Sequence, residues 1–421
     1  MRSVVVTGLG WATCLGYERA AVLSALREGR HGFTSADFLG TPEAAVRVAA
    51  PPMGFDLASS ESVDWIWPAN FSLEPARLRG YAPHVVYAHC ALQAALVESG
   101  LTPGELQDMR TGLYCASAGS PMLMRHHIGR MAATGWKRGH PLGVVSAAAG
   151  TLNFNLAAAL GIRGSVAGFV SACASSGHAL GHAWDEIALG RQDRMLIVAG
   201  EDLNPESLLP FTAMGALSLN PDPDLASRPF DKARDGFVGT GGGVAMILES
   251  EESARARGAR IQARLLGWGQ SADGHHVAMP QPEGQGIERA MRATLEAAGL
   301  APARIDHVNA HATSTPAGDR AETLALHRVF TEAGATPAIT STKGLTGHGL
   351  SMSSLLEASF CVLALDEKFI PGNAPSLRDP DAITEGLHLP RQSLLDTAPQ
   401  FILNNSSGFG GSNVCEVFGL A

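Results

Sequence analysis

The sequence predicts an α/β layered fold made of two similar halves. Strand-like apolar runs alternate with helical segments along all 421 residues, and this alternation is typical of layered α/β folds. Residues 1–255 and residues 256–421 repeat a similar order of elements, which suggests an internal duplication although no strong sequence repeat is visible. We expect the charged segment 251–257 to be the hinge between these N-terminal and C-terminal halves.

Apolar runs predict the strands of the N-terminal half, and longer periodic or small-residue runs predict its helices. The expected strands are residues 3–8, 111–116, 165–172, 194–199 and 242–248. The expected helices are residues 20–27, 82–100, 141–160 and 174–189, of which the second ends at a glycine, a common helix stop. Residues 31–70 show no clear period and are expected to be irregular.

The C-terminal half has the same alternation. The expected strands are residues 261–266, 305–309, 401–404 and 414–418. The expected helices are residues 286–298, 319–330 and 349–365, and the last of these is almost entirely apolar. Both halves thus predict sheets flanked by helices.

Composition narrows the class of protein. The net charge is −9 and no basic block is present, so no nucleic-acid footprint is apparent. No stretch reaches the roughly 20 apolar residues of a membrane span, and the N-terminus does not read as a signal peptide. The six cysteines are scattered without a C-x-x-C pair, which favours a reducing cytoplasmic location and predicts no metal site.

Cys173 lies between a predicted strand and a predicted helix. The helix dipole and free N–H groups at such a junction favour a thiolate and can stabilise an oxyanion. Taken alone, the pattern also fits a buried structural cysteine, which is the interpretation we prefer for the other five.

Two histidines follow strands of the C-terminal half. His311 lies in the segment NAHATSTPAGD, and His348 lies in STKGLTGHG. His311 taken alone could be satisfied by its own loop, with Asp319 as a helix N-cap. Glu357 stands among apolar residues and needs a partner, for which Lys343 is the candidate.

The last candidate motif is the glycine-rich segment NNSSGFGGSN, residues 404–413. It fits either an ordinary hairpin turn or a mobile gate with a backbone oxyanion donor. Because ligand sites of α/β folds lie at strand ends, one cysteine, two histidines and this segment predict a common site. A thiolate with two neutral imidazoles suits covalent acyl transfer.

These motifs together resemble the β-ketoacyl-acyl-carrier-protein synthases, ketosynthases of the type I/II class in the thiolase superfamily. The resemblance spans VVVTGLG, SACASSGHALG, RPFDKARDGFVGTGGG, HATSTPAGD, STKGLTGH and GFGGSN, in the family's order and spacing. It implies a thiolase-like αβαβα fold with mixed five-stranded sheets. It also implies decarboxylative Claisen condensation of a carrier-bound acyl group with malonyl-acyl carrier protein.

The resemblance assigns roles to particular residues of this chain. Cys173 is the implied nucleophile, and His311 and His348 are implied to hold the malonyl thioester carbonyl and the enolate. Lys343 and Glu357 form the supporting ion pair. The remaining implied groups are the Cys173 and Phe409 N–H donors of the oxyanion hole, the gate residues Gly408, Phe409 and Gly410, and the phosphopantetheine contacts Thr313 and Thr315.

The resemblance also implies partners. The expected partners are an acyl carrier protein, for which Arg79 and Arg138 are candidate docking residues, and a second subunit. That subunit is a copy of this chain or a chain-length factor. No cofactor is expected, because the substrates travel on the phosphopantetheine arm of the carrier. We treat His126-His127 and His275-His276 as ordinary surface or lining residues.

Three positions depart from the family pattern. The segment after His348 reads GLSMSS instead of a Gly/Ala run, residue 407 is Ser instead of Phe, and residue 312 is Ala instead of Gly. We interpret these changes as altered substrate shape and as a hint of a specialised polyketide, polyene or lipid pathway. Residues 114–128 are expected near the acyl tunnel.

Three alternative functions remain open. A non-catalytic partner protein is disfavoured because Cys173, His311 and His348 are all present. A degradative thiolase is disfavoured because residues 404–413 contain no second cysteine. A cysteine hydrolase would need a water path and a group orienting one histidine.

Overall fold

A computed structural model describes residues 1–39 and 46–421. Its main sheet has ten strands in the order β10-β9-β11-β12-β8-β1-β7-β6-β4-β5. These strands are β1 Val4–Ala12, β4 Thr111–Ala116, β5 Val166–Phe169, β6 Arg194–Glu201, β7 Gly242–Ser250, β8 Ala263–Ala272, β9 His307–Asn309, β10 Ala338–Thr340, β11 Phe401–Gly408 and β12 Ser412–Leu420. The strands β2 Thr34–Ser35 and β3 Val48–Ala49 form a separate small sheet.

The two halves of the main sheet have the same topology. The N-terminal order β1-β7-β6-β4-β5 corresponds to the C-terminal order β8-β12-β11-β9-β10. In both orders, the first two pairings are antiparallel and the last two are parallel. The halves join where β1 pairs with β8. This correspondence supports the expected duplication.

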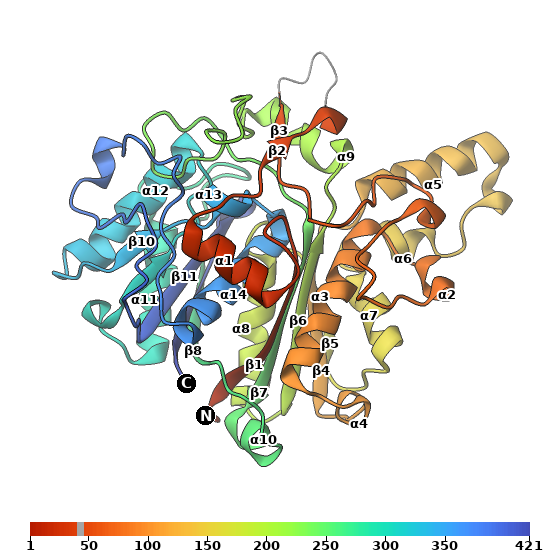
Figure 1. Ribbon diagram of the computed structural model, residues 1–421, viewed down its shortest axis with the longest axis horizontal. Helices are drawn as coiled ribbons and strands as arrows, with labels where there is room; N and C mark the ends of the chain where they lie inside the picture. Colours follow the sequence, from red (N-terminus) through yellow and green to blue (C-terminus); the bar gives the residue numbers. More distant parts are fainter. Residues whose placement is uncertain (40–45) are drawn as a thin grey trace.

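Helices cover both faces of each half (Figure 1). The longer helices are α1 Arg19–Glu28, α3 Pro83–Ser99, α5 Pro121–Thr134, α7 Leu152–Leu160, α8 Ser175–Ala188, α11 Gln285–Ala298, α12 Pro316–Leu326 and α14 Ser353–Asp366. The shorter ones are α2 Pro75–Leu78, α4 Pro103–Leu106, α6 Gly143–Ala147, α9 Pro205–Leu208, α10 Glu251–Ala256 and α13 Lys343–Thr346.

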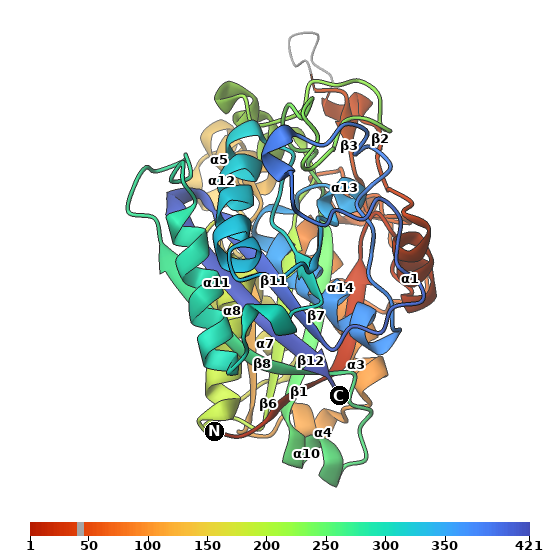
Figure 2. The same ribbon diagram turned by 90° about the vertical axis from the view of Figure 1, so that its left-hand side faces the viewer.

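The helices α8 and α14 form the inner layer between the two halves (Figures 1 and 2). Both follow the end strand of their half, and they pack against each other. Outside them, α3 covers β1 and β7, and α11 covers β8 and β12. Nearly every residue of α14 is buried, which explains why its sequence has no polar face.

Several local predictions need correction. The single helix expected over 141–160 is two helices, α6 and α7, because the chain turns through Gly150 at φ +75°. The segment expected as the hinge holds the helix α10, whose start is capped by Ser250, and its role as a hinge stays a prediction. The helix expected from residue 349 begins at Ser353 after a short 3-10 turn, Leu350–Met352.

Within the described residues, no helix is both long and apolar enough to cross a membrane. The domain boundary at 255/256 falls inside α10 and stays a prediction.

Candidate active site

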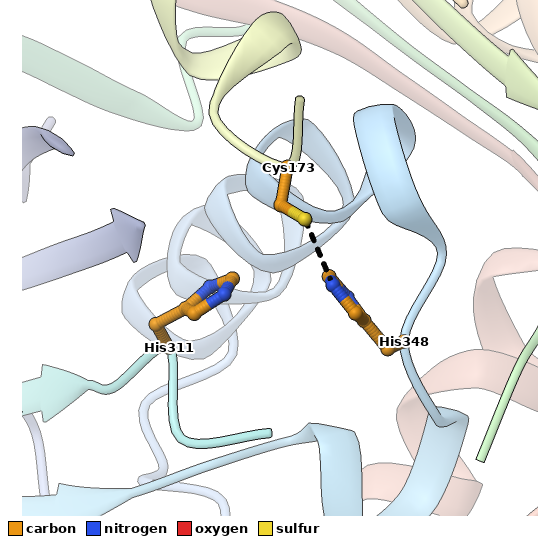
Figure 3. Close-up of side chains that lie close together, drawn as sticks. All are labelled: Cys173, His311 and His348. Carbon is orange, nitrogen blue, oxygen red and sulfur yellow. Dashed lines mark hydrogen bonds between the residues drawn. The ribbon is translucent and has the colours of Figure 1, made fainter. Parts of the chain in front are cut away.

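Cys173 occupies a tight turn between β5 and α8. The preceding residue, Ala172, has φ +51°, a left-handed conformation that is unfavourable for a residue with a Cβ. Ala174 is the N-cap residue of α8, so the cysteine stands just before the helix, as the sequence predicted. This turn directs the half-buried side chain toward the C-terminal half (Figure 3).

Cys173, His311 and His348 come together in three dimensions (Figure 3). One nitrogen of each imidazole and the Cys173 sulfur lie within 4.8 Å of one another. His348 Nε2 is 3.1 Å from Cys173 Sγ. The two imidazole rings are 5.4 Å apart at 86°, so they approach the sulfur from different directions. A small polar group bound between the two imidazoles would contact both rings and the Cys173 sulfur.

Burial controls the charge state of these groups. Desolvation raises the pKa of Cys173 to about 12, although Lys343 and a hydrogen bond from the Phe409 N–H act in the opposite direction. Burial, reinforced by Lys343, holds the pKa of His311 and that of His348 well below the usual value. Burial therefore favours the expected neutral imidazoles, whereas at Cys173 it opposes the thiolate that the helix N-terminus favours, so the resting thiolate stays a prediction.

The Lys343–Glu357 ion pair is present as predicted, between α13 and α14. Both side chains are at least 98% buried, since their relative exposures are 1% and 2%. Burial raises the pKa of Glu357 to about 7, while Lys343 lowers it. The Lys343 ammonium also disfavours protonation of both histidines.

Glu322 holds the His311 loop, and the sequence analysis missed it. Its carboxylate accepts hydrogen bonds from the His311 N–H at 2.8 Å and the Ala312 N–H at 2.7 Å. Burial raises its pKa to about 7. Its position three residues after Asp319 did not mark it as a functional residue, because acidic residues three positions apart are common on exposed helices.

Asp319 is not the helix N-cap that was considered for it. The N-cap residue of α12 is Thr315, which makes no side-chain cap bond. Asp319 lies inside the first turn and accepts a hydrogen bond from the Phe230 N–H at 3.0 Å. Its role is to join this loop to the segment around Phe230.

The glycine-rich segment is a hairpin turn that also reaches the nucleophile. The β11–β12 pairing continues to Gly408 and Ser412, so only Phe409–Gly411 forms the turn. A Cβ on Gly408 would lie 2.9 Å from the Cys173 nitrogen, so only glycine fits there. Gly410, at φ +79°, makes the turn possible. A hairpin turn and a backbone N–H donor near the nucleophile, the two interpretations considered for this segment, are thus compatible.

Phe409 is 36% exposed and contacts a row of aromatic rings. Its ring centroid is 6.0 Å from that of Phe211, which is 5.5 Å from Phe237. Phe237 in turn lies 5.1 Å from the His348 ring at 87°. These rings connect the turn with the buried histidine.

Two of the three serines that replace the family's small residues after His348 have polar partners. Ser351 donates its hydroxyl and its N–H to Glu201 at the end of β6. Ser353 Oγ lies 2.8 Å from His348 Nδ1. Burial raises the pKa of Glu201 to about 8. Both serines were expected beside the acyl site, but neither contact could be predicted, because Glu201 lies on another element and His348 Nδ1 is on one edge of a ring.

The remaining candidates are peripheral. Thr313 and Thr315 share a hydrogen bond of 3.0 Å between their hydroxyls. Arg79 and Arg138 are exposed. His126 and His127 line a cavity of about 520 Å³ with Arg79 and Arg130, while His275 and His276 lie in an exposed loop.

A buried thiol beside two neutral imidazoles and an N–H donor defines a site for covalent acyl transfer in an α/β enzyme. Comparison with known proteins identifies the family. Residues 1–254 match the family described as "Beta-ketoacyl synthase, N-terminal domain", and residues 262–376 match "Beta-ketoacyl synthase, C-terminal domain". The chain belongs to the β-ketoacyl synthase family and is a carbon–carbon bond-forming acyltransferase.

Relatives match over the full length. The chain is 35% identical to the 3-oxoacyl-[acyl-carrier-protein] synthase 1 of Haemophilus influenzae, with 99% of each chain covered. It is 30% identical to a β-ketoacyl synthase structure from Burkholderia phymatum, with all of both chains covered and a TM-score of 0.90. The ishigamide ketosynthase/chain length factor structure gives 29% identity, coverage of 100% and 99%, and a TM-score of 0.87. The predicted thiolase-like fold is thereby confirmed.

Proposed function

We propose that this protein condenses a carrier-bound acyl group with malonyl-acyl carrier protein, in fatty-acid or specialised polyketide or polyene synthesis. The main support for this proposal is that Cys173 Sγ and one nitrogen of each imidazole lie within 4.8 Å of one another. In this proposal no metal or organic cofactor takes part, and each substrate arrives on a phosphopantetheine arm held by Thr313 and Thr315.

The first half-reaction loads the enzyme. The Cys173 sulfur attacks the thioester carbonyl, the carrier sulfur leaves, and the thiol proton ends on the carrier sulfur. The N–H groups of Cys173 and Phe409 stabilise the transient oxyanion. Gly408 supports this assignment, because a side chain there would press on the Cys173 N–H.

The second half-reaction forms the new bond. Carbon dioxide leaves the malonyl group, and the electron pair of the broken bond becomes an enolate. His311 and His348 donate hydrogen bonds to its oxygen, since each neutral imidazole carries one N–H donor. The enolate carbon attacks the acyl carbon, the Cys173 sulfur leaves as a thiolate, and a proton from water restores the thiol.

Two of the alternative functions lose support at this site. A thiolase would need a second reactive cysteine, but Cys415 is buried in β12 and hydrogen-bonds Asn405 at 2.8 Å. A hydrolase would need a group that orients a histidine as a base toward water. Here the His348 ring faces Cys173 on one edge and Ser353 on the other.

A basic segment supports docking of an acidic carrier protein. Residues 121–140, which include α5, hold four basic residues and no acidic residue in a chain of net charge −9. They are Arg125, Arg130, Lys137 and Arg138. Arg79 joins Arg130 at the cavity below α5. We therefore keep Arg79 and Arg138 as docking residues.

The edge strand β5 supports assembly with a second subunit. It ends the main sheet, and its outer edge has no strand partner among residues 1–39 and 46–421. Exposed apolar side chains lie on this strand, next to it in the chain and on the helix α7 that packs against it: Val166, Val170 and Phe154. Such an edge is normally covered. We favour a homodimer, although the ishigamide relative is a ketosynthase/chain length factor assembly.

The segment GLSMSS after His348 departs from the family pattern by its polar serines. This difference supports a substrate other than an ordinary saturated chain. A panel of saturated and unsaturated carrier-bound acyl chains tests this point, and best turnover on saturated C8–C14 chains would count against it. Six free cysteines fit a cytosolic location.

Intact-mass analysis with acyl-carrier and malonyl-carrier protein tests the proposal. We expect acylation of Cys173, then release of carbon dioxide and a carrier product two carbons longer. Acylation without elongation points to a missing partner subunit or the wrong acyl chain. Failure of Cys173 to acylate with any donor would overturn the enzymatic proposal.

A further inference from the structure

Ser353 lies on the opposite side of the His348 ring from the nucleophile. It is the first residue of α14 and is 1% exposed. Its Oγ is 2.8 Å from His348 Nδ1, whereas His348 Nε2 is 3.1 Å from Cys173 Sγ. The Gly349 N–H donates to the same Ser353 Oγ at 3.0 Å.

The hydroxyl of Ser353 determines where the His348 proton sits. A hydroxyl has one proton to donate, and the Gly349 N–H already occupies one of its acceptor positions. Outside the undescribed residues 40–45, His348 Nδ1 is the only acceptor that the hydroxyl contacts. A proton on Nδ1 would leave the buried O–H without an acceptor, which is unfavourable. The ring proton of neutral His348 therefore belongs on Nε2.

The neighbouring residues hold this arrangement in place. Ser351, two residues earlier, bonds to Glu201 of β6 through its N–H at 3.1 Å and through its hydroxyl. Phe237 packs edge-on against the His348 ring at 87°. The short segment between His348 and α14 is thus tied to the N-terminal half, which also carries Cys173.

We propose that Ser353 is a positioning residue that fixes His348 as the Nε2–H tautomer. The ring then presents a hydrogen-bond donor, and not a lone pair, to the group bound beside Cys173. A donor stabilises the enolate formed on loss of carbon dioxide, whereas a lone pair would repel it. This role deepens the proposed function and rests on it for its consequence in catalysis.

Ser354 provides a matched control within the same turn. It is also a serine and is fully buried. Its hydroxyl has no hydrogen-bond partner among the residues that the structure places. Removing this hydroxyl changes the same chemical group at the next position without affecting the ring of His348.

The test compares Ser353→Ala, Ser353→Thr and Ser354→Ala in the full-length protein. We expect Ser353→Ala to lower kcat for carbon dioxide release from malonyl-carrier protein by roughly 5- to 10-fold, because only the Nε2–H fraction of a tautomer mixture is active and the ring also loses its anchor. We expect KM and the rate of Cys173 acylation to change by less than about threefold. Ser353→Thr retains a hydroxyl and restores kcat, and Ser354→Ala behaves as the wild type.

Nitrogen-15 NMR of histidine-labelled protein reads the tautomer directly, with His348→Gln identifying the signal. We expect Nε2–H in the wild type and in Ser353→Thr, and a mixture of tautomers in Ser353→Ala. An Nδ1–H wild-type ring, or equal losses in Ser353→Ala and Ser354→Ala, would overturn the role. If the ring is Nε2–H but no malonyl thioester is decarboxylated, the tautomer assignment stands and the proposed function fails.

Discussion

The two halves of the molecule share one topology but differ at their end strands. Beyond β10, the backbone of His388 pairs with Ala338 and Ile339, so that edge is covered by the chain itself. Beyond β5, the described residues place no such segment. The same fold unit thus has one closed and one open edge, and the open edge is the one that leads directly to Cys173.

The halves also divide the chemistry unequally. The N-terminal half supplies the sulfur, whereas the C-terminal half supplies both imidazoles, the Lys343–Glu357 pair and the Phe409 N–H. The inner helices show the same division. The helix α8 follows the nucleophile, while α14 carries Glu357 and Ser353 under the histidines. The duplication thus separates a half suited to acyl loading from a half suited to decarboxylation.

The largest expected effect separates these two activities. Cys173→Ala should reduce condensation by at least about 10⁴-fold, because no other sulfur can take the acyl group. Release of carbon dioxide from malonyl-carrier protein should continue, because both histidines remain. Carbon dioxide release and chain elongation are measured in parallel, with Cys90→Ala in α3 as the control that should keep both. Loss of both activities in Cys173→Ala would show that the halves do not act separately.

The complementary change is in the C-terminal half. His311→Ala should slow carbon dioxide release by about 10²- to 10³-fold, the usual cost of removing one donor to a developing oxyanion. Acylation of Cys173, followed by intact mass, should persist, because it is His348 that contacts the sulfur. His276→Ala, in an exposed loop, is the control. Equal loss of acylation and decarboxylation would contradict the division.

The ion pair behind the histidines should determine the stability of the C-terminal half. Lys343→Met leaves the Glu357 carboxylate buried without its partner and should lower the free energy of unfolding by about 3–5 kcal/mol. Adding Glu357→Gln should recover most of this loss. Lys232→Met removes an exposed pair with Asp379 and should cost less than about 1 kcal/mol. Urea unfolding measures all four proteins, and equal losses for both lysines would refute the argument.

Much of this arrangement was readable from the sequence. Strand–turn–helix junctions identified Cys173 and His348, and an apolar helix containing one carboxylate predicted the Lys343–Glu357 pair. These inferences succeed because local pattern and the rule that buried charge needs a partner apply without knowledge of tertiary contacts.

The contacts that tertiary packing creates were not readable. Glu322 bonds the backbone of the His311 loop, and Glu201 bonds Ser351 across the two halves. Neither carboxylate is distinguished locally from an exposed glutamate. The charge state of Cys173 was not readable for a related reason, because the helix N-terminus is visible in the sequence but the burial that opposes a thiolate is not.

The smallest expected effect is a dependence of stability on pH. Burial raises the pKa of Glu201 and of Glu416 to about 8, and raises that of Glu322 and of Glu357 to about 7. The unfolded chain loses these protons at much lower pH. Between the unfolded-state and folded-state pKa of each carboxyl, the folded protein therefore holds more protons than the unfolded chain.

Stability should therefore fall as the pH rises from 7.5 to 8, where histidines of the unfolded chain, with a pKa of about 6.5, are almost fully neutral and oppose the trend only weakly. Each carboxyl contributes at most about 1.4 kcal/mol per pH unit. Three of the four lie in the C-terminal half, so Glu416→Gln and Glu201→Gln should each flatten the profile of Tm against pH only in part. A Tm that rises between pH 7.5 and 8, or a profile that Glu201→Gln alone makes flat, would show that the buried carboxyls of the C-terminal half do not titrate in this interval.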